Sequence, residues 1–250
     1  MKLAGKVALI TGAGQGVGQG IALAMAREGA TIAVTGRTLD KLNTTRSMIE
    51  EIGGKAIAIA CNVKDVASVE ACVASVVEQL GGINILVNNA QEVPLGTLLE
   101  VTDEAFEAGW QSGPNATMRL MKLCHPHLKG GGCIVNLAST AAKRWDASGF
   151  GAYAAVKEAI RALTRAAACE WAKDGIRTNV ILPHATSPGL KWWIENCPEE
   201  AEAFIATIPM GRVGDCEQDI GRFVATLVSD DCAYVNGQSI AVDGGQAFMG

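Results

Sequence analysis

The sequence lacks the features that mark nucleic-acid-binding and membrane proteins. Its 21 basic and 26 acidic residues are interspersed and give a formal net charge of −5, and they form no basic stripe that could follow a phosphate backbone. No apolar run approaches the roughly 18 residues that cross a bilayer. The first six residues lead directly into a predicted strand instead of a signal-peptide core. We therefore expect a cytoplasmic protein whose partners include neither nucleic acid nor membrane.

Metal-binding and disulfide patterns are also missing. The chain has only three histidines, of which His125 and His127 flank Pro126 near a predicted helix end. Its eight cysteines are widely scattered and form no C-x-x-C pair. These spacings match no metal-ligand pattern and no disulfide framework. We therefore predict no metal site, structural roles for His125 and His127, and thiols that are mostly buried and reduced.

Short runs rich in β-branched residues alternate with longer, alanine-rich helical stretches. The runs lack strict polar alternation, so helices should cover both faces of the sheet that they form. This pattern predicts a doubly wound α/β fold with a seven-stranded parallel sheet, whose ligands lie at the carboxyl ends of the strands. The predicted strands are Val7 to Thr11, Thr31 to Thr35, Ala56 to Cys61, Ile83 to Asn88, Cys133 to Ala138, Thr178 to Leu182 and Ser239 to Val242.

No linker, repeat or low-complexity tract divides the chain. Its 250 residues include 49% hydrophobic side chains, enough apolar material for one large core. We predict a single domain over residues 1–250. The only long stretch outside the strand–helix alternation runs from residue 184 to about 214, and we interpret it as a helical lid over a substrate site.

A glycine-rich segment follows the first predicted strand and opens an alanine-rich helix. Gly12, Gly16 and Gly18 stand where a backbone must turn tightly and approach a phosphate group. The free N–H groups at the helix start and its positive dipole end stabilise negative charge there. The segment favours a dinucleotide site, and the alternative is an ordinary strand-to-helix turn.

Four motifs in this order resemble the short-chain dehydrogenase/reductase family over essentially the whole chain. They are Gly12-x-x-x-Gly16-x-Gly18, Asn88-Asn89-Ala90, Tyr153-x-x-x-Lys157 and Val242-Asp243-Gly244-Gly245. The resemblance implies a Rossmann-type fold and an oxidoreductase that uses NAD(H) or NADP(H). The candidate cofactor-binding residues are Gly12, Gln15, Gly16, Val17, Gly18, Arg37, Asn62, Val63, Asn89, Ala90, Tyr153, Lys157, Pro183 and Thr186.

The end of the second strand bears on the choice of cofactor. An acidic residue there binds the ribose hydroxyls of NAD, whereas a basic residue pairs with the 2′-phosphate of NADP. Gly36 occupies the acidic position and Arg37 follows it. We therefore favour NADP(H), with NAD(H) as the alternative, and a solvated surface arginine remains the plain interpretation of Arg37. Asn62, where the resemblance puts an adenine-contacting residue, can accept a hydrogen bond from the adenine amine.

Tyr153 and Lys157 are four residues apart on a predicted helix, so their side chains project from one face. A neighbouring ammonium stabilises a phenolate, and we expect it to move the pKa of Tyr153 towards working pH for general acid–base catalysis. The resemblance adds Ser139, at the end of the fifth strand, as the residue that hydrogen-bonds the substrate oxygen. It also implies that Lys157 binds the nicotinamide ribose.

The sequence departs from the family pattern at the fourth helix. Gly113 stands where the resemblance places a catalytic asparagine that holds a water in a proton relay. Asn115 is two residues on, a step that turns a side chain about 200° around a helix. Pro114 removes one backbone N–H and can bend the helix. Asn115 is therefore only a secondary candidate for the relay.

Two further departures lie near the expected nicotinamide site. Gln91 replaces a glycine after Asn88-Asn89-Ala90, and His184 follows Pro183 where glycine is usual. These residues and Glu92 can reshape the substrate pocket or take the place of the missing asparagine in the proton relay. The alternative is neutral variation in loops. The candidate substrate-contacting residues are Gln91, Trp145, His184 and Trp192.

The main functional hypothesis is hydride transfer between NADP(H) and a small-molecule alcohol or ketone. Trp145, Phe150, Trp192, Trp193 and Phe248 suggest a bulky hydrophobic substrate, while Lys143 and Arg144 leave an anionic one open. The alternatives are a nucleotide-binding regulator or scaffold with weak catalysis, and an epimerase or dehydratase. The resemblance also implies a homotetramer or homodimer, with helices at Gly109 to Leu128 and Tyr153 to Lys173 at the interface.

Overall fold

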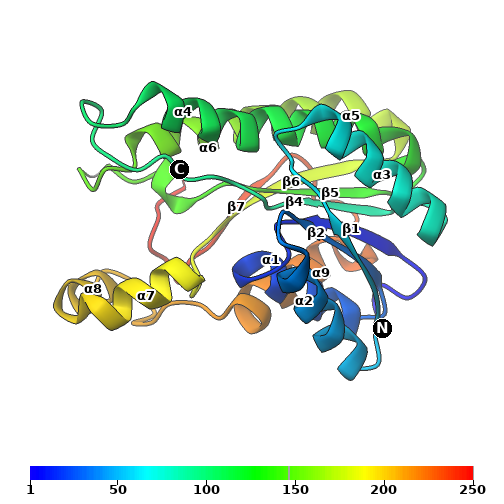
Figure 1. Ribbon diagram of the computed structural model, residues 1–250, viewed down its shortest axis with the longest axis horizontal. Helices are drawn as coiled ribbons and strands as arrows, with labels where there is room; N and C mark the ends of the chain where they lie inside the picture. The colour runs from blue at the N-terminus through cyan, green and yellow to red at the C-terminus, as the bar shows by residue number, and fades with distance from the viewer. Residues whose placement is uncertain (146, 250) are drawn as a thin grey trace.

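The computed structural model describes residues 1–145 and 147–249, and Figure 1 shows their arrangement. All seven predicted strands are present, and every pair is parallel in the order β3-β2-β1-β4-β5-β6-β7. The largest boundary error is at β4, which begins at Ile85 and not at Ile83. The strands are β1 Val7–Thr11, β2 Thr31–Gly36, β3 Lys55–Ala60, β4 Ile85–Asn88, β5 Cys133–Leu137, β6 Arg177–Pro183 and β7 Ser239–Val242.

Helices cover both faces of the sheet, as the doubly wound pattern predicts (Figure 1). On one face lie α1 Gly16–Arg27, α2 Leu39–Glu51 and α9 Arg222–Leu227. On the other lie α3 Val66–Leu80, α4 Asp103–Trp110, α5 Ala116–Leu128 and α6 Gly151–Trp171. No helix of the described residues is long and apolar enough to cross a membrane.

The alternation of side chains along each strand fills both layers. In β1, Ile10 packs with α1 and α2, whereas its neighbour Leu9 packs with α3 and α5. Both side chains are fully buried. Because neither face of the sheet meets water, the strands contain apolar residues at successive positions, which explains the missing polar alternation in the sequence.

The cysteines are less buried than predicted. All eight are free thiols, but only Cys61, Cys72, Cys124 and Cys133 are buried, and Cys169 is exposed. The prediction of mostly buried cysteines is therefore wrong. Cys169 lies in α6 at a position that faces solvent, whereas Cys124 in α5 faces the sheet.

The carboxyl ends of all seven strands meet at one edge of the sheet. β1 pairs with β2 on one side and with β4 on the other, so the loops that follow β1 and β4 separate there. This reversal of strand order is the point where open parallel sheets bind ligands. The fold therefore brings the glycine-rich segment and Asn88-Asn89-Ala90 to the same place.

The segment from residue 184 to 214 extends beyond this edge. It contains α7 Pro188–Asn196 and α8 Pro198–Ile205, which project from the body of the molecule in Figure 1. A bridge between Ala185 and Gly214 closes the base of the segment. The predicted helical content is therefore present at the carboxyl edge.

Helix α1 makes a close crossing with the π-helical turn η4, Cys216–Gly221. A Cβ atom at Gly20 would lie 2.3 Å from the backbone carbonyl of Cys216. We expect Gly20→Ala to lower the free energy of unfolding by roughly 1–3 kcal/mol, because the helix must shift to accommodate a methyl group. Urea denaturation measures the effect. Gly189→Ala is the control, since a Cβ there meets nothing within 4 Å, and equal losses in both variants would contradict the packing argument.

Candidate active site

The glycine-rich turn is held in place by Asn89 from the loop after β4. Its amide Nδ2 donates to the carbonyl oxygens of Thr11, at 2.8 Å, and Gly12, at 3.0 Å. A Cβ atom would lie 2.8 Å from this Nδ2 at Gly12 and 2.5 Å from it at Gly18, and Gly12 has a positive φ of 65°. Only glycine fits these two positions without displacing Asn89.

The start of α1 is open to an approaching anion. Its N-cap residue, Gln15, makes no side-chain capping hydrogen bond, and its first turn contains no acidic residue. The first N–H groups of the helix are therefore available to an anion, and the helix dipole favours negative charge at this end. Glycine turn and helix terminus together fit the pyrophosphate of a dinucleotide.

A cavity of about 480 Å³ lies over this turn and is lined by the loops after β1, β2, β3 and β4. Nine predicted cofactor residues line it, namely Gly12, Gln15, Gly16, Val17, Arg37, Asn62, Val63, Asn89 and Ala90. Gly18 instead packs beneath Asn89. Thr186 lines a neighbouring cavity beside Gln15 and Gly16, and Pro183 ends β6 at the same edge of the sheet.

The cavity wall also contains charged residues that the sequence analysis did not single out as ligands. Lys41 and Lys64 line it together with Arg37. The Nζ atom of Lys41 donates to Oε1 of Gln15 at 2.7 Å. Lys41 lies in the first turn of α2, just after the loop that follows β2, and Lys64 lies in the loop that follows β3. That placement is the only signal that could have found them.

Ser139, Tyr153 and Lys157 come together at the carboxyl end of β5. Lys157 is buried in α6, and its Nζ donates to the carbonyl oxygen of Leu137, the last residue of β5, at 2.7 Å. The same Nζ lies 5.4 Å from the centre of the Tyr153 ring. The Ser139 hydroxyl group lies close enough to Tyr153 to lower the pKa of the phenol. A phenol and an amine thus share one enclosed space.

The expected lowering of the pKa of Tyr153 is wrong for this structure. Burial raises the pKa of Tyr153 to about 12, and the nearby Ser139 hydroxyl group only partly opposes this rise. Burial also lowers the pKa of Lys157 to about 7. Desolvation penalises the charged form of both groups, and Lys157, which loses its proton near pH 7, is neutral in the range where Tyr153 ionises. At neutral pH Tyr153 is therefore a neutral phenol, and Lys157 is only partly protonated.

Gln91 fills the space that Gly113 leaves. Gly113 lies in the π-helical turn η1, Gln111–Asn115, between α4 and α5, so the predicted long helix is interrupted there. A Cβ atom at Gly113 would lie 2.5 Å from Oε1 of Gln91 and 2.8 Å from a methyl carbon of Val156 in α6. This Oε1 is buried without a hydrogen-bond partner among the described residues. Asn115 faces a different cavity beside α3.

The substrate candidates are only partly brought together. His184 makes an edge contact with Phe204 of α8 at 5.3 Å between ring centres, and Trp193 of α7 makes another at 5.6 Å. The Nδ1 atom of His184 is buried without a partner in the described part of the chain, and burial lowers the pKa of its ring. Trp145 and Trp192 are instead exposed at 102% and 62%. No sequence motif pointed to Phe204, which packs against both rings.

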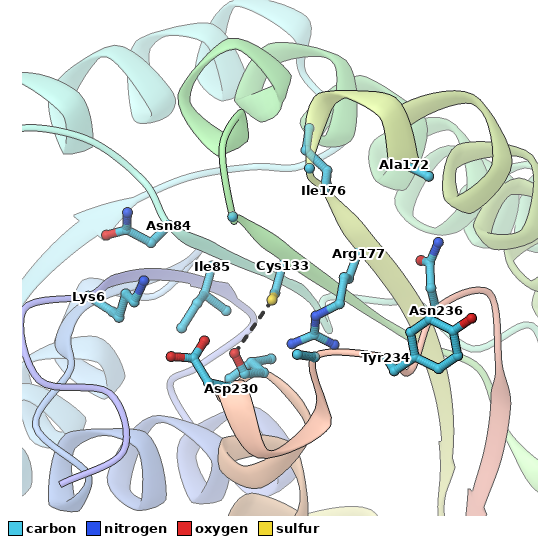
Figure 2. Close-up of a pocket in the computed structure, with 14 residues that line it drawn as sticks. Lys6, Asn84, Ile85, Cys133, Ala172, Ile176, Arg177, Asp230, Tyr234 and Asn236 are labelled. Atoms are coloured by element: carbon cyan, nitrogen blue, oxygen red, sulfur yellow. Dashed lines mark hydrogen bonds between the residues drawn. The ribbon is translucent and has the colours of Figure 1, made fainter.

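A second cavity, of about 580 Å³, lies at the opposite edge of the sheet (Figure 2). The Arg177 guanidinium group donates there to the carbonyl oxygens of Leu227, Ser229 and Val235. The Cys133 thiol donates to Val228, as the dashed line in Figure 2 marks. These polar groups already bind the loop before β7, so we interpret this cavity as a packing feature.

No group of three or more histidine, cysteine or acidic side chains in residues 1–145 and 147–249 is placed to hold a metal ion. His125 has a structural role, as predicted. Its ring lies 2.9 Å from an oxygen of Asp174 and 4.8 Å from the ring centre of Trp171. These contacts join the end of α5 to the end of α6.

Fold and site define a protein of the doubly wound, dinucleotide-binding class. A family model described as enoyl-(acyl carrier protein) reductase matches residues 12–247. The chain belongs to the short-chain dehydrogenase/reductase family, whose members are oxidoreductases that use NAD or NADP.

Relatives and solved structures agree with this assignment. The chain is 40% identical to a 12α-hydroxysteroid dehydrogenase of a Clostridium species, with 96% of each chain covered. It is 35% identical to a sorbitol dehydrogenase of Cereibacter sphaeroides, with 98% of each covered. A short-chain dehydrogenase of Burkholderia cenocepacia, solved with NADP, is similar with a TM-score of 0.91, 30% identity, and 98% and 99% of the two chains covered.

The pKa of Tyr153 can be measured directly, because the chain has two tyrosines and the other, Tyr234, is fully exposed. In a Tyr234→Phe variant, we expect ultraviolet absorbance to report Tyr153 as only about one tenth ionised near pH ~11, where a free tyrosine is about nine tenths ionised. Circular dichroism checks that the protein is folded.

The raised pKa of Tyr153 also makes the stability of the fold depend on pH. The contribution of the neutral phenol to the free energy of unfolding is fully present below the pKa of about 10 that Tyr153 has in the unfolded chain. That contribution is lost as the pH rises towards the folded pKa of about 12. If the absorbance titration of the folded Tyr234→Phe variant had its midpoint at or below pH ~10, the desolvation argument would be contradicted.

Proposed function

We propose that the protein is an NADP(H)-linked oxidoreductase that interconverts a secondary alcohol and a ketone, with Tyr153 as the general acid or base. The arrangement of Ser139, Tyr153 and Lys157 at the carboxyl end of β5 carries the proposal. The π-helical turn η1 links these groups to the dinucleotide cavity, because its Ser112 lines that cavity while its Gly113 lies against α6.

Each of the three residues has a distinct task in this mechanism. Ser139 orients the substrate oxygen by a hydrogen bond. In the direction of reduction, the Tyr153 hydroxyl donates its proton to that oxygen as negative charge develops on it. Lys157 orients the tyrosine and binds the nicotinamide ribose. Bound NADPH supplies the hydride, and the protein contributes position and electrostatics.

The cofactor residues fit this role at both ends of the cavity. The glycine turn and the open start of α1 accept the pyrophosphate. Arg37, Lys41 and Lys64 place positive charge at the adenosine end, where NADP carries an additional phosphate. The absence of an acidic side chain at Gly36 supports NADP(H) over NAD(H).

The substrate proposed is a bulky cyclic secondary alcohol or its ketone, such as a hydroxysteroid. The cluster of His184, Trp193 and Phe204 provides an apolar surface at the base of residues 184–214, which we propose to be a lid. The 40% identity to a 12α-hydroxysteroid dehydrogenase supports a fused-ring substrate. Gln91, Trp145 and Trp192 remain predicted substrate contacts.

Replacing Tyr153 by phenylalanine tests the mechanism. We expect turnover on a panel of cyclic alcohols and ketones to fall by about 10²-fold or more, because the proton donor is lost, while the Kd for NADPH changes by less than about twofold. Steady-state kinetics and fluorescence titration measure the two effects. Tyr234→Phe is the matched control, since that side chain is fully exposed.

Three outcomes would contradict parts of the proposal. Full turnover in Tyr153→Phe would remove Tyr153 from the proton transfer. Tight NADPH binding with no wild-type turnover on a broad panel would support a nucleotide-binding regulator or scaffold. A clear preference for NADH would overturn the argument from Arg37 and Gly36.

We also propose a homotetramer, or at least a homodimer, through the exposed faces of α5 and α6. Met118 in α5 is 43% exposed, although it is apolar. Cys169 and Glu170 in α6 are also exposed. We expect light scattering at micromolar concentration to give four times the mass of one chain, and a stable monomer would contradict the proposal.

A further inference from the structure

The Glu92 carboxylate bridges two cations across the dinucleotide cavity. Its Oε1 lies 2.9 Å from Nη1 of Arg37 and 3.0 Å from Nζ of Lys64, and its Oε2 lies 3.2 Å from the same Nζ. Arg37 belongs to the loop after β2, Lys64 to the loop after β3, and Glu92 to the loop after β4. All three line the cavity.

The backbone of Glu92 is fixed at both of its polar groups. Its N–H donates to Oγ of Ser112 at 2.9 Å, and its carbonyl oxygen accepts from Nε2 of Gln91 at 2.7 Å. The same Nε2 also donates to the carbonyl oxygen of Gly109 at 2.8 Å. Gln91 takes this position over Gly113, where any larger residue would displace it. The loop is therefore anchored to the turn between α4 and α5, and the Glu92 side chain extends from that anchor to the two cations.

The position of Glu92 matters because a phosphate dianion and a carboxylate bind the same cations. Of the three cations that line the cavity within the described residues, Arg37 and Lys64 are held by Glu92, and Lys41 is held by the neutral amide of Gln15. An adenosine 2′-phosphate that pairs with Arg37 must therefore compete with Glu92.

We propose that Glu92 is an internal competitor for the 2′-phosphate of NADP(H) and so limits the discrimination of the protein between NADP(H) and NAD(H). The inference rests on the proposed dinucleotide site. Release of the carboxylate accompanies phosphate binding, whereas a nucleotide without a 2′-phosphate leaves the carboxylate on its two cations. Glu92 is thus a specificity-determining residue, and Gln91 is the positioning residue that holds it.

The test uses nucleotide fragments that bind without turnover. Adenosine 2′,5′-bisphosphate contains the 2′-phosphate, and 5′-AMP is the same molecule without it. We expect Glu92→Gln to tighten binding of the bisphosphate by about 3- to 10-fold, because two partly exposed ion pairs no longer compete, and to change the Kd for 5′-AMP by less than about twofold. Isothermal titration calorimetry of the whole protein measures both.

Three further variants separate the competition from other effects. Glu100→Gln makes the same change in net charge at an exposed carboxylate that hydrogen-bonds Thr97, and it should alter neither Kd. Arg37→Met should abolish the gain produced by Glu92→Gln. Gln91→Met keeps the bulk over Gly113 but removes the Nε2 donor, so it should tighten binding of the bisphosphate by a smaller factor than Glu92→Gln does.

Two results would overturn the inference. If Glu92→Gln weakens 5′-AMP and leaves the bisphosphate unchanged, the carboxylate accepts hydrogen bonds from the ribose hydroxyls and favours NAD(H). If both ligands tighten equally, the effect is general electrostatics. A wild-type protein that binds 5′-AMP more tightly than the bisphosphate would instead contradict the proposed preference for NADP(H), while a selective gain in Glu92→Gln would still support the competition.

Discussion

The carboxyl edge of the sheet depends on one set of hydrogen bonds between β1 and the loop after β4. The Thr11 hydroxyl oxygen accepts the backbone N–H groups of Asn89 and Ala90, each at 3.0 Å, and the Asn89 amide returns to the carbonyl oxygens of Thr11 and Gly12. Thr11 is almost fully buried, so these bonds are shielded from water. They fix the glycine turn against the loop that continues into Gln91 and Glu92.

Two of the departures from the family pattern, Gly113 and Gln91, form one connected unit with Glu92. The absence of a side chain at Gly113 leaves room for Gln91, and the Gln91 amide fixes the backbone of Glu92. The Glu92 carboxylate then joins the loops after β2 and β3. A glycine at position 91 could make none of these side-chain contacts, so residues 91, 92 and 113 are best understood together.

Burial explains the protonation states of Tyr153 and Lys157. Lys157 is buried, and its Nζ donates to the carbonyl oxygen of Leu137. Desolvation keeps Tyr153 neutral at neutral pH and leaves Lys157 only partly protonated. A neutral phenol can donate a proton, as the proposed function requires of Tyr153.

The sequence by itself determined the seven strands, the glycine turn and the spacing of Tyr153 and Lys157, because these depend on local periodicity and short motifs. The replacement of the expected asparagine by Gly113 was also visible in the sequence. Only the tertiary structure decided that Gln91 fills that gap, that Lys41 and Lys64 face the cavity, and that burial controls the pKa of Tyr153. Each of these features joins elements far apart in the chain, and its energy depends on distances and desolvation that no local pattern specifies.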